Sequence, residues 1–136
     1  MLTYIFRKPK YPIICTISGH VIAAKSEKSF MKILDDIALD PEKSYDLIDT
    51  TAEGWSFMPG HLMISPITFR KQWSKRELIA LYNGRTNQQP EGVPYSEKSL
   101  SSKRFERIFG DLVELLLKKP GKPLDKMSQA TTTSAL

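Results

Sequence analysis

The stretch YPIICTISGHVIAA, residues 11–24, decides the fold. Its two apolar runs flank Ser18-Gly19, a pair typical of a two-residue hairpin turn, so it predicts two antiparallel strands. In this register Ile17 faces His20 and Cys15 faces Ile22. Both faces of the hairpin are then apolar, with Ile13, Cys15, Ile17 and Ile22 on one and Ile14, Val21 and Ala23 on the other. Strands that are apolar on both faces are usually covered on both, so we expect flanking helices, or a second copy of the chain against one face.

The segments after the hairpin supply candidates for these covers. Residues 26–39 predict an amphipathic helix that Ser26 caps and Asp40-Pro41 ends, because the residue before proline avoids the helical region. Three short apolar runs, at residues 45–49, 55–58 and 61–65, are separated by turn signals and predict two or three antiparallel strands. A last helix is expected from about Ser101 to Lys119, with a wide apolar arc that includes Leu112 and Leu115.

This order of elements predicts an α+β fold, a mainly antiparallel sheet of about five short strands packed with two or three helices. Residues 1–120 are expected to form a single domain. Residues 84–100 lack periodicity and hold several Gly and Pro, so they predict a long loop. The low hydrophobicity of residues 121–136 predicts a disordered tail.

Composition narrows the class of protein. The chain has a net charge of +5 and one cysteine, so no internal disulfide forms and a reducing, cytoplasmic location is expected. No apolar stretch approaches the roughly 20 residues that span a membrane, so no membrane partner is expected. The charge is unevenly distributed: residues 31–69 carry two Lys/Arg and seven acidic residues, whereas residues 70–85 carry five Lys/Arg and one. A basic block of this kind favours anionic partners.

The basic block contains the best-specified short helix, QWSKRELIALYNGR at residues 72–85. Ser74 and Glu77 have the spacing of a capping box, and Trp73 and Leu78 that of a hydrophobic staple. Two cations, Lys75 and Arg76, nevertheless occupy the first turn, where the helix dipole disfavours positive charge. Such local conflicts cluster at functional sites.

We therefore interpret this helix start as a candidate anion or nucleic-acid site, which Arg7, Lys8 and Lys10 could extend. The alternative interpretation is a solvated helix face on which Trp73 serves only as the staple. A helix-turn-helix is disfavoured, because Ser65-Pro66 leaves little room for a first helix. The candidate binding residues are Arg70, Lys71, Trp73, Lys75, Arg76 and Arg85.

Other chemistry has little support in the sequence. The two histidines and Cys15 lack zinc-ligand spacing, and the glycines lack phosphate-loop spacing, so neither a metal nor another cofactor is expected. Cys15 and His20 would lie about 7–8 Å apart on the hairpin, too far for a thiolate–imidazole pair.

Three functions remain in competition. The first is a small non-catalytic binding or regulatory domain that contacts nucleic acid or another polyanion, such as an acidic protein, through the basic helix start. The second is a protein–protein interaction module that forms a homo-oligomer, such as a homodimer. The third is a small enzyme with a pocket near Asp49, Glu53 and His61.

Overall fold

A computed structural model describes residues 2–67, 72–86 and 94–117 of the chain. Within these ranges its elements are β1 (Thr3–Tyr4), β2 (Ile13–Ile17), β3 (His20–Ala24), α1 (Glu27–Leu34), β4 (Tyr45–Asp49), β5 (Gly54–Met58), β6 (Met63–Pro66), α2 (Lys75–Asn83), α3 (Ser99–Ser102) and α4 (Phe105–Leu117). The predicted tail, residues 121–136, and part of the predicted loop, residues 87–93, lie outside the described residues.

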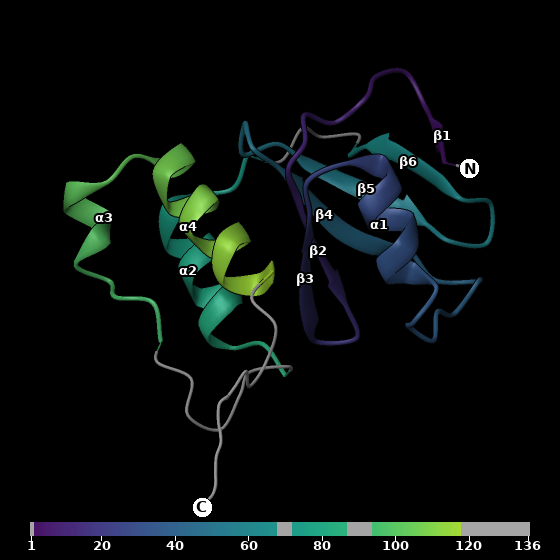
Figure 1. The fold of residues 1–136 in the computed structure, drawn as a ribbon. Coiled ribbons are helices and arrows are strands. Elements are labelled where there is room, and N and C mark those ends of the chain that lie inside the picture. The colour runs from purple at the N-terminus through teal and green to yellow at the C-terminus, as the bar shows by residue number, and fades with distance from the viewer. Residues whose placement is uncertain (1, 68–71, 87–93, 118–136) are drawn as a thin grey trace, which may run out of the picture.

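The strands form one sheet in the order β1-β6-β5-β4-β2-β3 (Figure 1). Its neighbours pair antiparallel, except that β1 runs parallel to β6. The predicted α+β class and mainly antiparallel sheet are confirmed, and the described residues form six strands instead of about five and four helices instead of two or three. The additional strand, β1, has only two residues, too few to leave a periodic pattern in the sequence.

The predicted hairpin register is confirmed. Ile17 pairs with His20 and Cys15 with Ile22. Ser18 and Gly19 have φ values of 52° and 87°, and two consecutive positive values are typical of the type I′ turn, whose twist matches that of the strands. A Cβ on Gly19 would lie 2.9 Å from Thr86 Cγ2, so glycine also allows the segment after α2 to approach the turn.

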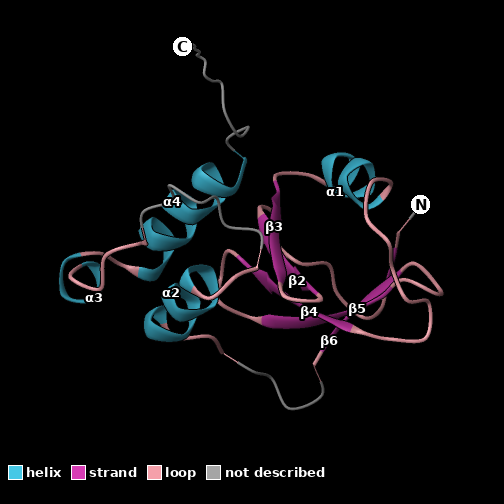
Figure 2. Ribbon diagram, turned by 90° about the horizontal axis from the view of Figure 1, so that it is seen from below, coloured by secondary structure: helices cyan, strands magenta, loops and turns pink. Residues whose placement is uncertain are grey.

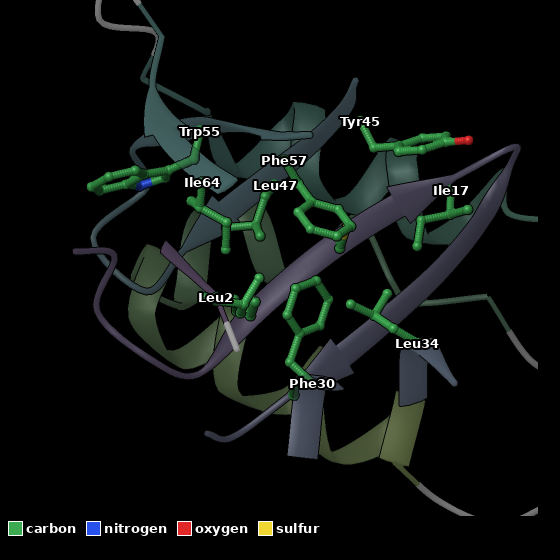
Figure 3. Close-up of a cluster of buried hydrophobic side chains, with 12 residues drawn as sticks. Leu2, Ile17, Phe30, Leu34, Tyr45, Leu47, Trp55, Phe57 and Ile64 are labelled. Atoms are coloured by element: carbon green, nitrogen blue, oxygen red, sulfur yellow. The ribbon is translucent and has the colours of Figure 1, made fainter. Parts of the chain in front are cut away.

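Helices cover both faces of the sheet, which is the first of the two arrangements expected for the hairpin. Figure 2 shows α1 on one side, α2 and α4 on the other, and α3 farther out. The α1 side buries a cluster that Figure 3 draws in close-up: Leu2, Ile13, Cys15, Ile17, Ala24, Phe30, Leu34, Tyr45, Leu47, Trp55, Phe57 and Ile64. The opposite side buries Ile14, Val21, Ala23, Ile48, Leu78, Ile79, Tyr82, Ile108, Phe109, Leu112 and Val113.

The first predicted helix is shorter than expected. Ser26 caps α1 as predicted, but the helix ends at Leu34, not at Asp40. Beyond it, Asp36 N donates to Ile33 O and Ile37 N to Leu34 O, so the chain tightens into successive i→i+3 turns. Two adjacent aspartates at the negative end of the helix dipole oppose further extension.

The predicted last helix, Ser101 to Lys119, is in fact two helices. Lys103 is extended, with φ −128° and ψ 146°, and separates α3 from α4. The carbonyl of Arg104 then accepts from Arg107 N and Ile108 N, which starts α4. The predicted apolar arc was correct for Leu112 but too wide at Leu115, which is 37% exposed. Lys118 and Lys119 lie outside the described residues.

We predict that Leu112→Ala lowers the free energy of unfolding by about 2–5 kcal/mol, because it leaves a cavity between α4 and the sheet. Leu112 is 0% exposed, whereas the 37% exposed Leu115 on the same helix is the matched control and should cost less than about 1 kcal/mol as Leu115→Ala. Urea unfolding of both variants measures the difference. Equal losses would mean that α4 packs on the sheet through another face.

Candidate functional site

The start of α2 is built as its sequence predicts. Ser74 N donates to Glu77 Oε1 at 3.0 Å and Glu77 N to Ser74 Oγ at 3.1 Å, which completes the capping box. Trp73 packs against the same cluster that buries Leu78, as a hydrophobic staple requires. Two further candidate residues, Arg70 and Lys71, lie outside the described residues.

Lys75, in the first turn of α2, has a structural contact that the sequence does not reveal. Its Nζ donates to the carbonyls of Leu100 at 2.6 Å and Lys103 at 2.9 Å. These carbonyls lie within α3 and at its C-terminal cap, where a cation complements the dipole. Lys75 therefore ties α2 to the junction between α3 and α4, and this contact accounts for one of the two cations that conflict with the dipole of α2.

Arg76, the next residue, remains largely in solvent. Its side chain is 75% exposed, and its guanidinium lies 3.6 Å from Glu97, whose side chain is 71% exposed. Ion pairs between exposed side chains contribute little, because water and salt screen them. Arg76 can therefore exchange Glu97 for another anion at little cost.

Arg85 lies at the other end of α2. Its guanidinium stacks 3.8 Å from the centre of the Tyr82 ring and donates to the carbonyl of Tyr82 at 2.7 Å. The nine residues of α2, Lys75–Asn83, rise about 14 Å, and Arg85 lies two positions beyond the end of the helix. The structure therefore does not bring Arg85 together with the cations of the first turn.

The N-terminal loop, residues 5–10, lies beside the segment that enters α2. Arg7 forms two hydrogen bonds with the Glu53 carboxylate, at 2.9 and 2.5 Å, and its guanidinium lies 5.1 Å from the centre of the Trp55 ring. Glu53 in turn forms a β-bridge with Gln72, and Trp73 N donates to Ala52 O. These contacts place the loop next to the start of α2, although more than 60 residues separate them in the sequence.

The carboxylates near this loop serve the fold. Asp49 is 2% exposed and Glu53 5% exposed. Asp49 accepts from the backbone N–H groups of Lys10, Thr51 and Glu53, from Thr51 Oγ1 and from Trp55 Nε1. These five hydrogen bonds join three segments through Asp49: the N-terminal loop, the turn that follows β4, and strand β5.

The third residue of the hypothetical pocket, His61, lies elsewhere. Asp49 and Glu53 lie before β5, whereas His61 is exposed in the turn after it. Five residues of strand separate the two ends by about 16 Å. The structure therefore does not assemble Asp49, Glu53 and His61 into one site.

Cys15 and His20 do not form a catalytic pair. Burial raises the pKa of the Cys15 thiol, which disfavours the nucleophilic thiolate. His20 is exposed, and its Nδ1 lies 3.1 Å from Thr86 Oγ1. Cys15 behaves as a small buried apolar residue, as its position in the hairpin suggested.

A second group of cations, at the start of α4, escaped the sequence analysis. Both α2 and α4 begin at the same end of the helical layer (Figures 1 and 2), where Lys75 contacts the backbone before α4. Lys103 Nζ donates to Asp111 at 3.0 Å, and Arg107 lies 3.3 Å from the same carboxylate. Arg104 is exposed and forms no ion pair within the described part of the chain. The run SSKRFER, residues 101–107, carried the signal, but the sequence analysis interpreted it as the first turns of one long helix.

Asp111 holds this second group in place. Tyr95 Oη donates to Asp111 at 2.6 Å, and Lys103 Nζ also contacts the Tyr95 hydroxyl at 3.1 Å. The pKa of Asp111 is lowered, chiefly because Tyr95 donates to its charged form and then because Lys103 lies beside it. Lys103 and Arg107 are therefore partly neutralised, whereas Arg104 is not.

Comparisons with protein-family models, with curated proteins and with solved structures find no match to the chain. Among residues 2–67, 72–86 and 94–117, no group of three or more His, Cys, Asp and Glu side chains is placed to hold a metal ion. None of the helices in those ranges is both long and apolar enough to cross a membrane.

The contacts of Lys75 and Arg76 predict that substitution of the two residues changes stability by different amounts. We expect Lys75→Met to lower the free energy of unfolding by about 1–3 kcal/mol, because it leaves two carbonyls without their charged donor. The adjacent Arg76→Gln is the matched control and should change stability by less than about 0.5 kcal/mol. Thermal or urea unfolding tests the pair. A neutral Lys75→Met would show that its two hydrogen bonds contribute nothing net to the fold.

Proposed function

We propose that the chain is a non-catalytic binding domain for polyanions, nucleic acid foremost. The proposed contact surface, here called the basic edge, consists of Lys8 and Lys10 of the N-terminal loop, Arg76 of α2 and Arg104 at the start of α4. All four residues are exposed. None is held by a buried acidic partner within the described residues, so each can contact a phosphate without breaking a structural ion pair.

The observation that carries the proposal is the chain of contacts from Arg7 through Glu53 to Gln72. It joins a basic loop at one end of the sequence to the basic start of α2. Lys75 extends the connection to the start of α4. Several cations from distant segments along one edge can neutralise successive phosphates, which is the usual source of affinity for nucleic acid.

The interaction-module alternative loses its main support in the structure. This alternative rested on the hairpin with two apolar faces and on the wide apolar arc of the last helix. Both hairpin faces are covered within one chain, and the arc of α4 packs against the sheet except at Leu115 and Leu117 in its last turn. Polyanion binding would therefore use surface that the fold leaves in solvent, whereas an interface through the hairpin would need surface that the fold already buries.

The test is a titration of single-stranded and duplex DNA oligomers at several salt concentrations. The log of the binding constant should fall against log[salt] by roughly 0.7 per neutralised phosphate for the single strand and 0.9 for the duplex. The double variants Lys8→Gln/Lys10→Gln and Arg76→Gln/Arg104→Gln should each reduce the slope by up to about two such increments. Both should melt as the parent does, because these side chains are exposed.

The matched control removes two charges from elsewhere. Lys32, on α1, and Lys43, between α1 and β4, are exposed and lie outside the basic edge. Lys32→Gln/Lys43→Gln has the same net charge as the other double variants and should leave the slope nearly unchanged. Equal loss in all three would mean that only total charge matters, and no binding at low salt would refute the proposal.

A further inference from the structure

Phe6, in the N-terminal loop, is the most exposed large apolar side chain of the described residues. It is 92% exposed. Its backbone is also unusual, because φ is +66° and Arg7 N donates to Ile5 O at 2.7 Å across it. A positive φ within an i→i+2 hydrogen bond defines the classic γ-turn, which is rare and strained for a residue other than glycine. The chain thus holds a bulky aromatic residue in a strained turn and in water.

The loop is fixed on both sides of Phe6. Before it, Ile5 N donates to Ile64 O at 2.9 Å and joins the loop to β6. After it, Arg7 forms its two hydrogen bonds with Glu53, and Lys10 N donates to Asp49 Oδ2. The anchors determine where Phe6 projects, although Phe6 itself belongs to neither buried cluster. Neither packing nor a relaxed backbone accounts for phenylalanine here, and strain of this kind concentrates at functional sites.

The charges around Phe6 indicate what would cover it. Arg7 faces Glu53 and Asp49, so its charge is largely balanced inside the protein. Lys8 and Lys10 are exposed, and Lys8 Nζ lies 5.2 Å from the centre of the Tyr4 ring. The positive charge that the loop presents to solvent therefore comes from Lys8 and Lys10, which follow Phe6 closely in the sequence. An aromatic ring beside basic side chains is the arrangement on which single-stranded nucleic acids bind.

We propose that Phe6 is a stacking platform for an unpaired base of a single-stranded nucleic acid, whose phosphates lie along Lys8 and Lys10. This inference rests on the proposed polyanion function and assigns its preferred ligand. In a duplex the bases already stack on one another, so an isolated ring at a loop tip has no base to contact. The single strand offers both a free base face and a flexible backbone, so Phe6 selects single strands over duplexes.

A membrane surface fits these observations less well. Adsorption to lipid needs a broad apolar face, whereas this loop exposes one ring. The other large apolar residues that are notably exposed in the described chain, Leu115 and Leu117, belong to the last turn of α4 and not to this loop. Stacking needs only one ring, so the single exposed Phe6 beside two lysines favours a nucleotide base.

The experiment compares anionic ligands that carry bases with anionic ligands that do not. The full chain is titrated with a thymidine oligomer of about ten nucleotides, its RNA counterpart, an abasic oligomer of equal length, polyglutamate, and vesicles of phosphatidylserine and phosphatidylcholine. Phe6→Ala should weaken binding of the thymidine oligomer about 5-fold to 100-fold, the usual contribution of one stacked base. It should leave the weaker binding of the abasic oligomer unchanged.

Two further variants separate stacking from mere apolar contact. Phe6→Trp keeps an aromatic face and should retain the affinity for the thymidine oligomer. Phe6→Leu keeps an apolar side chain without a ring and should lose as much affinity as Phe6→Ala. Because Phe6 lies outside both cores, all three variants should melt within a few degrees of the parent, so a loss of binding does not reflect unfolding.

The outcomes distinguish this inference from the function on which it rests. If the abasic oligomer binds with a steep salt dependence and Phe6→Ala changes nothing, the polyanion function stands and the stacking inference fails. Equal losses on thymidine and abasic oligomers, or full affinity in Phe6→Leu, also overturn stacking. Binding that depends on Phe6 for polyglutamate or vesicles but not for the oligomers would assign the loop to an acidic protein or to a membrane. No binding to any polyanion refutes both proposals.

Discussion

Strand β2 has to bury both of its faces, and the arrangement of the other elements follows from that constraint. Ile13, Cys15 and Ile17 point toward α1, whereas Ile14 points toward α2 and α4. A strand of this kind cannot lie at a solvated surface without exposing apolar area to water. The chain covers one face with α1, which precedes β4 in the sequence, and the other with α2 and α4, which follow β6. The sheet therefore lies between helices on both sides (Figure 2).

Because the sheet is buried on both sides, the binding surface that we propose lies at its margins. Loops and helix starts remain in solvent there, and the described surface cations at these margins differ in how firmly they are held. Lys75 and Arg85 donate to backbone carbonyls at helix ends, and Arg7 forms a two-point ion pair with the nearly buried Glu53. Lys10 and Arg104 have no such contact. The first group maintains the fold, whereas Lys10, Arg104 and the solvent-exposed Arg76 are free to exchange partners.

The sequence was sufficient where a feature depends on neighbouring residues. The hairpin register followed from Ser18-Gly19 and alternation, and the capping box followed from Ser74 and Glu77, because both involve contacts between residues close in sequence. The predicted end of the first helix was wrong, and so was the prediction that the last helix continues through Lys103. Both features depend on hydrogen bonds that compete over a single turn. Boundaries of this kind change with small energies that periodicity does not encode.

The candidate site was less predictable, because its geometry depends on contacts between distant residues. No local sequence pattern predicts that Glu53 accepts hydrogen bonds from Arg7 and also forms a β-bridge with Gln72. The cations at the start of α2 looked equivalent in the sequence, yet Lys75 reaches into carbonyls of another helix while Arg76 faces solvent.

The exposure of Phe6 also depends on contacts that the sequence does not predict. Phe6 belongs to the apolar run MLTYIF, in which Leu2 is buried. Only the γ-turn, which reverses the chain after Ile5, turns Phe6 outward. Phe6 thus lies in water, in the same loop as Lys8 and Lys10. The anchors that Arg7 and Lys10 form with the two buried carboxylates, Glu53 and Asp49, fix the loop after Phe6 and so hold the strained turn in place.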